Sequence, residues 1–188
     1  MARVKRSFYL RPTLTVAKDL LGKNIVRKIG NRKLKARIVE TEAYLGPKDM
    51  AAHTFGGKVT KRNKTVFKKG GHIYIYLCYG LHWQLNFVTR KKGVPECILI
   101  RAAEPVSKRK IVGKTNGPGK LCRWFGLDKS FDKEDLVNSK RIWLETDGDK
   151  IKKSQILSSE RIGIEYAKEW ARKPWRFYLR NNSFVSRK

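Results

Sequence analysis

The sequence predicts an α+β protein: a single compact domain over residues 1–188, with a mostly antiparallel, curved β-sheet flanked by a few short helices. Three observations predict it. The 188 residues fall within the roughly 100 to 200 typical of one domain. Segments typical of strands outnumber those typical of helices, and most follow one another directly, which favours antiparallel pairing. Neither a repeat nor a proline-rich or serine/glycine linker marks a boundary inside the chain.

The first predicted element is a short helix that starts at Pro12 and is terminated by Gly22. Its apolar spacing places Leu14, Ala17 and Leu21 on one face, which we expect to be buried. Glycine is the residue that most often follows the last turn of a helix, because it adopts the left-handed conformation without a steric penalty.

A β-hairpin follows this helix. Strands are predicted over Asn24–Arg27 and Lys33–Tyr44, and Gly30 and Asn31 between them are typical of a tight hairpin turn. Successive strand residues point to opposite faces. One face of the second strand is therefore expected to carry Ile38, Glu40, Glu42 and Tyr44. The other face is expected to carry Arg37, Val39, Thr41 and Ala43.

The remaining elements are mostly strands, because they are rich in β-branched and aromatic residues. The predicted strands are His72–Tyr79, Gln84–Thr89, Cys97–Ala102, Ile142–Glu145, Arg161–Ile164 and Phe177–Arg180. Gly80 allows a turn between the first two of these strands. A short helix is predicted over Lys120–Phe125, after the loop Gly117-Pro118-Gly119 and before Gly126.

The charge is strongly positive: 44 Lys and Arg against 16 Asp and Glu give a net charge of +28. Such a field favours a polyanion as partner, nucleic acid first and an anionic membrane second. A lysine-rich surface that only keeps the protein solvated is the alternative reading of the charge. Since 40% of the residues are hydrophobic, a disordered basic tail is excluded.

Membrane and metal sites are not indicated. The sequence has no apolar stretch of about 18 residues and no charged-then-apolar leader, so we expect an intracellular protein without a membrane contact. Cys78, Cys97 and Cys122 are widely spaced and lack histidines at ligand spacing, which does not favour a zinc module and indicates reduced, mostly buried thiols.

Carboxylates are scarce in the basic first half, and three of them fall within ten residues: Glu40, Glu42 and Asp49. The residues alone leave three interpretations open. The acids converge on Mg²⁺ for phosphodiester cleavage, or one glutamate acts as a general base toward water. Alternatively, Glu40 and Asp49 only form ion pairs with nearby arginines and lysines.

Aromatic residues form the second candidate feature, with Tyr74, Tyr76 and Tyr79 within six residues. In a basic protein such rings stack on bases or act as wedges in place of a nucleotide. For tyrosines taken alone, however, ordinary core packing is the favoured interpretation. Glu42 and Tyr44 lie on one strand face, and a catalytic acid beside an aromatic ring describes a pocket for a base.

The order of these motifs along the whole chain resembles the alkyladenine (3-methyladenine) DNA glycosylase family, the mammalian-type N-methylpurine DNA glycosylases. The segments that carry the resemblance are Arg37 to Pro47 (RIVETEAYLGP), Asp49, Ala51 to His53 (AAH), Arg62-Asn63, Tyr74 to Gly80 (YIYLCYG), Asn86, Leu99 to Ala102 (LIRA), Gly117 to Cys122 (GPGKLC) and Trp170 to Pro174 (WARKP). The connection from Val106 to Asn116 is shorter than in the mammalian relative.

The resemblance implies roles for individual residues. Glu42 matches the catalytic glutamate that activates the attacking water, and Arg101 and the carbonyl of Val185 match the groups that help to hold this water. The residues that match the pocket for the flipped base are Tyr44, His53 and Tyr76, which sandwich it, and Asn86, which screens its exocyclic groups. The His53 backbone amide matches the group that reads the purine edge. Tyr79 matches the wedge that fills the vacated stack.

The implied activity is that of a monofunctional DNA glycosylase, which flips alkylated or deaminated purines from duplex DNA and hydrolyses the N-glycosidic bond to leave an abasic site. Arg101 beside Glu42 favours the charged carboxylate, which stabilises an oxocarbenium-like sugar. No metal or other cofactor is required. We expect a monomer, located in the nucleoid of a prokaryote or the nucleus of a eukaryote. The lesion is left open among 3-methyladenine, 7-methylguanine, hypoxanthine and ethenoadenine.

Basic residues around this pocket are expected to contact the DNA backbone. The candidates are Lys61, Arg62, Lys64, Lys68 and Lys120. Two rival functions remain at this point: a nucleic-acid-binding protein without activity, and the Mg²⁺ nuclease built on the three acids. A chelator discriminates the nuclease, because a glycosylase continues to release base in EDTA.

Overall fold

The computed structural model describes residues 1–106, 114–148 and 151–187, so most of the connection from Val106 to Asn116 lies outside the described residues. The strands are β1 (Ala2–Arg3), β2 (Asn24–Ile29), β3 (Arg32–Tyr44), β4 (Ile73–Cys78), β5 (His82–Thr89), β6 (Glu96–Pro105), β7 (Ile142–Thr146), β8 (Ile156–Ser159) and β9 (Arg176–Leu179). The α-helices are α1 (Arg6–Tyr9), α2 (Thr13–Asp19) and α3 (Pro118–Phe125). Short 3₁₀ segments lie at Gly46–Lys48, Phe55–Gly57, Lys64–Phe67, Lys129–Phe131, Lys153–Gln155 and Glu165–Trp170.

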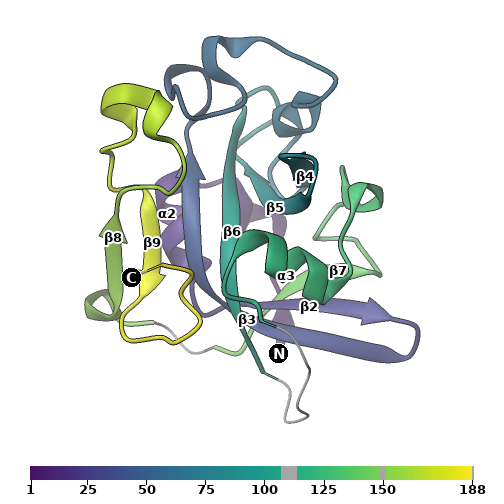
Figure 1. Cartoon of the computed structure of the whole chain (residues 1–188). Helices are drawn as coiled ribbons and strands as arrows, with labels where there is room; N and C mark the ends of the chain where they lie inside the picture. The colour runs from purple at the N-terminus through teal and green to yellow at the C-terminus, as the bar shows by residue number, and fades with distance from the viewer. Residues whose placement is uncertain (107–113, 149–150, 188) are drawn as a thin grey trace.

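The described strands form one sheet in the order β1-β7-β2-β3-β6-β5-β4, with β8 and β9 attached beside β3. Every pair in it is antiparallel, the sheet is curved and unclosed, and a few helices pack against it, so the α+β prediction is confirmed. In Figure 1, α3 lies in front of the long strands β3 and β6, and α2 lies behind them. None of the described helices is long and apolar enough to cross a membrane.

The hairpin prediction is confirmed. β2 and β3 pair from Asn24 with Arg37 to Ile29 with Arg32, and Gly30 in the turn has a φ of 55°, which glycine adopts without strain. Beyond this hairpin β3 continues along the sheet, pairing with β6 on one edge and with β9 on the other. Its last residues therefore lie at the upper end of the sheet, toward the loops drawn at the top of Figure 1.

The strict alternation predicted for β3 is wrong near its middle. The pairing with β6 omits Val39 on one strand and Arg101 on the other, which is a β-bulge on each side. As a result Ile38 and Val39 both belong to the main hydrophobic core, whereas alternation places them on opposite faces. A bulge reorients the side chains that follow it, and here these are Glu40, Glu42 and Tyr44.

One predicted strand is absent from the described structure: residues 161–164 form a loop that leads into the 3₁₀ segment Glu165–Trp170. Gly163 has a φ of 75°, which is incompatible with a strand, and the side chain of Arg161 is buried in an ion pair instead of lying along a sheet surface. The short strands β1 and β8 and the helix α1 were not predicted, because elements of two to four residues carry little periodicity.

The helix predictions are confirmed with adjusted ends and faces. Val16 and Ala17 of α2 and Leu20 just after it are completely buried. Of the three residues expected on the buried face, Ala17 and Leu21 are buried, whereas Leu14 is only half-buried. α3 begins two residues earlier than predicted, at Pro118. Proline fits the first turn of a helix, because a backbone N–H at this position has no acceptor within the helix and its absence loses no hydrogen bond. α3 packs against β5 and β6 and thereby brings its N-terminal end close to the end of the β4–β5 hairpin.

Candidate active site

Glu42 lies near the end of β3 and is fully buried. Its Oε2 accepts a hydrogen bond of 2.9 Å from the Tyr44 hydroxyl, and its Oε1 accepts one of 2.8 Å from the backbone N–H of Ile162. Arg101 Nη1 lies 3.3 Å from the same Oε1. A buried carboxylate is tolerated only where charges and donors replace its water, and all three partners supply this.

Arg101 joins Glu42 to a second glutamate. Its Nε lies 3.2 Å from Oε1 of Glu40, and its position at the bulge of β6 allows it to reach both acids. Burial alone lowers the pKa of Arg101, but the carboxylates of Glu42 and Glu40 outweigh burial and raise this pKa. The guanidinium is therefore a permanent positive charge beside Glu42.

Glu40 is held by its own set of donors. Arg176 Nη1 on β9 donates to its Oε1 at 2.8 Å, and Ser186 donates through its backbone N–H at 2.7 Å and its hydroxyl at 3.0 Å. The ion-pair interpretation of Glu40 is thus confirmed. Ser186 also places its neighbour Val185, which is buried in the core, close to this cluster.

Asp49 is held in the same manner by Arg161, whose Nη1 and Nη2 lie 2.6 Å and 2.9 Å from the two carboxylate oxygens. The same guanidinium donates to the carbonyl oxygens of Ala43 and Trp170 and lies 4.8 Å from the Tyr44 ring centroid. The three acids that the sequence groups together are therefore engaged by arginines. No cluster of metal-ligating side chains occurs among the described residues, so the arrangement does not favour the Mg²⁺ nuclease.

A cavity of about 450 Å³ opens in front of Glu42. Tyr44, Arg101 and Ile162, all of which contact Glu42, form part of its wall, so the carboxylate lies directly behind that wall. The structure brings all of the predicted base-pocket residues to this cavity, namely Tyr44, His53, Tyr76 and Asn86. Such a volume is ordinary for a small-molecule site.

The aromatic wall of the cavity is held in a neutral state. His53 Nδ1 lies 2.8 Å from the Tyr74 hydroxyl, and its ring meets the Tyr76 ring edge-on with centroids 4.5 Å apart. His53 opens onto the cavity, yet the protein around it, together with the charge of Arg62, lowers its pKa to about 4. Burial raises the pKa of Tyr44 and of Tyr76, so these phenols remain uncharged.

Asn86 is buried and lines the same cavity. Its Nδ2 donates to the backbone carbonyl oxygens of Gln84 at 3.1 Å and Tyr74 at 3.3 Å. Since both amide hydrogens are engaged by backbone, the group that the side chain has left to offer a ligand is its carbonyl oxygen.

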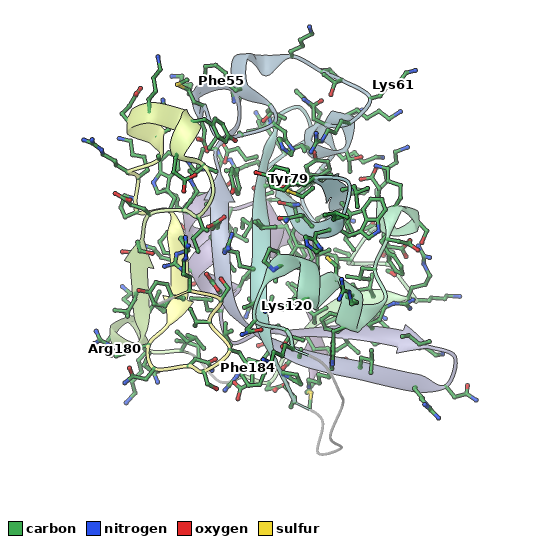
Figure 2. All side chains as sticks on the ribbon, in the orientation of Figure 1. Phe55, Lys61, Tyr79, Lys120, Arg180 and Phe184 are labelled. Carbon is green, nitrogen blue, oxygen red and sulfur yellow. The ribbon has the colours of Figure 1, made fainter. Side chains whose placement is uncertain are left out.

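Tyr79 stands at the tip of the β4–β5 hairpin, 90% exposed, and it also lines the cavity. Its φ of 49° is unusual for a residue with a side chain, and such strain tends to persist at functional sites. In Figure 2, Tyr79 lies between Lys61 and Lys120 on one side of the molecule.

The predicted backbone-contact residues divide into two groups. Lys61, Lys64, Lys68 and Lys120 are exposed. Arg62 is also exposed, but its guanidinium lies 5.0 Å from the Tyr76 ring centroid and lines the cavity. A phosphate contact by Arg62 stays a prediction, while its position at the wall of the cavity is a result that the sequence did not indicate.

A second depression of about 420 Å³ adjoins the first and shares Gln84, Arg101, Pro118 and Ile162 with it. Its other lining residues are mainly basic or polar: His82, Asn116, Gly117, Gly119, Lys120, Arg123, Ser186 and Arg187. α3 and β5 approach each other closely at this depression. A Cβ atom added to Gly119 would lie only 2.9 Å from the Cβ atom of His82.

Residues that the sequence reasoning missed come from late in the chain: Arg161, Ile162, Tyr166, Arg176 and Ser186. The signal available was weak. Arg161 and Arg176 are two arginines among 44 basic residues, and a backbone N–H such as that of Ile162 leaves no trace in a sequence.

Known proteins resemble this chain over almost its whole length. A profile of the methylpurine-DNA glycosylase family matches residues 7–183. A protein of Desulfitobacterium hafniense is 44% identical over 99% of this chain and 99% of its own length. One of Bdellovibrio bacteriovorus is 46% identical over 97% of this chain and 98% of its own length. Both carry the provisional name 3-methyladenine DNA glycosylase. By this match over almost its whole length, the chain belongs to the methylpurine-DNA glycosylase family and is a DNA glycosylase, a hydrolase of DNA repair.

Proposed function

We propose that this glycosylase turns a damaged purine out of duplex DNA into the cavity in front of Glu42 and hydrolyses its N-glycosidic bond, leaving an abasic site. The observation that carries the proposal is the position of the buried Glu42 carboxylate directly behind an aromatic cavity, held by Tyr44 and Arg101. Residues 1–188 act as one domain, the protein is a monomer, and its partner is double-stranded DNA that contains damaged purines.

The proposed chemistry uses the carboxylate twice. Glu42 stabilises the positive charge that develops on the sugar as the base departs, and it accepts the proton of the water that adds to the anomeric carbon. Each carboxylate oxygen has two acceptor sites. Ile162 and Arg101 occupy Oε1, and Tyr44 takes one site of Oε2, which leaves the second site of Oε2 for water. Arg101 and the carbonyl of Val185 position this water.

The base itself supplies part of the driving force. An N-alkylated purine is cationic and leaves as a neutral molecule, so the glycosidic bond breaks without a strong acid. A neutral His53 and two uncharged tyrosines suit a cationic ring, because aromatic faces attract a cation by about 0.5 to 2 kcal/mol. Since the names of the relatives specify 3-methyladenine, this lesion is the first candidate substrate.

Duplex binding completes the proposal. Tyr79 enters the stack at the position of the flipped nucleotide, and Asn86 at the cavity wall tests the exocyclic groups of the base. The exposed lysines 61, 64, 68 and 120 and the guanidinium of Arg62 hold the DNA backbone. Flipping a nucleotide requires a free energy of a few kcal/mol. This free energy is smallest for a damaged base pair, which contributes to selection of the lesion.

The test is base release from a panel of duplexes, each with one lesion (3-methyladenine, 7-methylguanine, hypoxanthine or ethenoadenine), with EDTA present. We expect free base and alkali-labile sites from the wild type. Glu42→Gln should lower release at least 100-fold while lesion binding persists. Glu104→Gln is the matched control, because Glu104 is paired with Arg37 at a half-exposed position of β6. Release by Glu42→Gln at the wild-type rate, or direct strand nicking that EDTA stops, would overturn the proposal.

A further inference from the structure

The loop that carries Ile162 presents a second exposed aromatic residue at the cavity. Tyr166 is 65% exposed and lines the same cavity as Tyr79, although the two come from different parts of the fold. Tyr79 stands on the β4–β5 hairpin, and Tyr166 stands in the 3₁₀ segment Glu165–Trp170, which is the yellow-green coil at the upper left of Figure 1. Large exposed aromatic side chains at a binding site are unfavourable in water and mark contact surfaces.

The loop that carries Ile162 and Tyr166 is held in place by an ion pair and by a small hydrophobic core. Arg161 anchors its beginning to Asp49 and its end to the carbonyl oxygen of Trp170. Ala167, next to Tyr166, is completely buried and packs in a small core with Ala51 and Ile164. Tyr166 therefore projects outward from a segment whose neighbours point inward, so its exposure does not arise from a loose loop.

The backbone after Tyr166 is strained in order to make this shape. Lys168 has φ 50° and ψ −128°, a combination that side-chain-bearing residues rarely adopt. Its carbonyl oxygen nevertheless accepts a hydrogen bond of 3.0 Å from Ala171 N–H, which closes the turn. Strain of this kind is kept only where the surrounding contacts enforce it, and it concentrates at functional sites.

Tyr79 and Tyr166 line the same cavity from two parts of the fold. Burial by the surrounding protein is the largest cause that raises the pKa of Tyr166, and Tyr79 is among the groups that raise it further.

We propose that Tyr166 stacks on the nucleotide that adjoins the flipped one on the same strand, on the side opposite to the gap filled by Tyr79. This inference rests on the proposed function. A nucleotide turned into the cavity leaves both of its neighbours on the strand without a stacking partner. Tyr79 supplies a ring to one of them and Tyr166 supplies a ring to the other, which is possible for any base because every base has a π-face. The surplus of positive charge on the protein favours the DNA strand as the occupant of this surface.

The base on which Tyr166 stacks can be identified by omitting each neighbouring base from the DNA in turn. Binding is measured by fluorescence anisotropy in EDTA, with a duplex that carries a 2′-fluorinated hypoxanthine nucleotide. The fluorine at C2′ makes the N-glycosidic bond resist hydrolysis, so the lesion stays intact during the measurement. Two further duplexes replace the 5′ or the 3′ neighbour of this nucleotide by a tetrahydrofuran abasic analogue. Tyr166→Ala is compared with Tyr166→Phe, which keeps the ring, and with Ile29→Ala, an exposed apolar residue at the end of β2.

We expect Tyr166→Ala to weaken binding to the intact lesion duplex about tenfold, and Tyr166→Phe and Ile29→Ala to stay within twofold of the wild type. The tenfold effect should vanish on one of the two abasic-neighbour duplexes, because the stacking partner is then gone. Tyr166→Ala should weaken binding to undamaged duplex much less, since no nucleotide is turned out there.

Three results would overturn the inference: wild-type affinity of Tyr166→Ala on the intact lesion duplex, a loss that persists on both abasic-neighbour duplexes, or an equal loss on undamaged DNA. The thermal midpoint of Tyr166→Ala controls for folding and should equal that of the wild type. Base release by the wild type from an unmodified lesion duplex is run in parallel. Failure of that release counts against the proposed function, whereas the binding series tests Tyr166 separately.

Discussion

The hydroxyl of Tyr44 donates a hydrogen bond of 2.9 Å to Oε2 of Glu42, two residues earlier on the same strand. One side chain thus both lines the cavity and holds the carboxylate behind its wall. The two oxygens of Glu42 have different partners, because Tyr44 engages Oε2 whereas Ile162 and Arg101 occupy Oε1.

Removal of this hydroxyl separates the two roles of Tyr44. Tyr44→Phe keeps the ring but leaves Glu42 without one donor, and a hydrogen bond to a charged group contributes about 1.5 to 3 kcal/mol. We expect kcat to fall about 10- to 100-fold with little change in KM, measured as base release from a lesion duplex. Tyr76→Phe is the matched control and should keep kcat within about threefold. Equal effects of the two variants would show that the bond to Glu42 has no catalytic role.

Arg101 is expected to matter for folding as well as for activity. It contacts both Glu40 and Glu42 in a buried site, and loss of one partner from a buried ion pair is destabilising by about 3 to 5 kcal/mol. Arg101→Met should therefore lower the free energy of unfolding by about this amount and abolish base release. Urea denaturation measures the first effect. Arg37→Met, which removes the half-exposed pair with Glu104, should lower stability by less than about 1 kcal/mol.

His53 gives the protein a pH dependence. Its pKa falls from the ordinary value of 6.5 to about 4 in the folded state, so the unfolded chain binds a proton more readily than the native one. The stability contributed by the neutral imidazole is therefore fully present above pH 6.5 and is lost as the pH falls toward about 4.

Comparison of His53→Gln with the wild type isolates this contribution. We expect the difference between their free energies of unfolding, followed by denaturation from pH 7.5 to pH 4, to shrink as the pH falls in this window. A difference that stays constant across the window contradicts the assignment. Base release by the wild type should also decline at low pH, since a protonated His53 repels a cationic base.

Salt dependence of binding and the rate of base release together distinguish Arg62 from the four lysines. Each of Lys61, Lys64, Lys68 and Lys120 that contacts a phosphate should, when replaced by alanine, reduce the slope of log affinity against log salt concentration by about 0.9. Arg62→Ala should in addition lower the base-release rate, because its guanidinium lies over the Tyr76 ring of the cavity. Unchanged slopes for all four lysines would show that DNA lies on another face.

The sequence by itself determined much of this protein. Strand periodicity located β3 and the hairpin turn at Gly30, and it placed Glu42 and Tyr44 on one face, which the hydrogen bond between them bears out. These features depend on neighbours in the chain, for which residue spacing is sufficient. The order of the motifs along the chain also identified the family, which the comparison confirms.

Tyr44 and Arg101 were already expected beside Glu42, but the tertiary structure alone decided the other contacts around this carboxylate. Arg101 reaches both acids because of a bulge, and Ile162 donates to Glu42 across 120 positions of the chain. Arg161, which the sequence placed on a strand, instead holds Asp49 and the loop of Tyr166. Such contacts depend on where distant segments meet and on backbone N–H groups that are the same for every residue type. Local periodicity carries no information about either, so only the folded chain shows them.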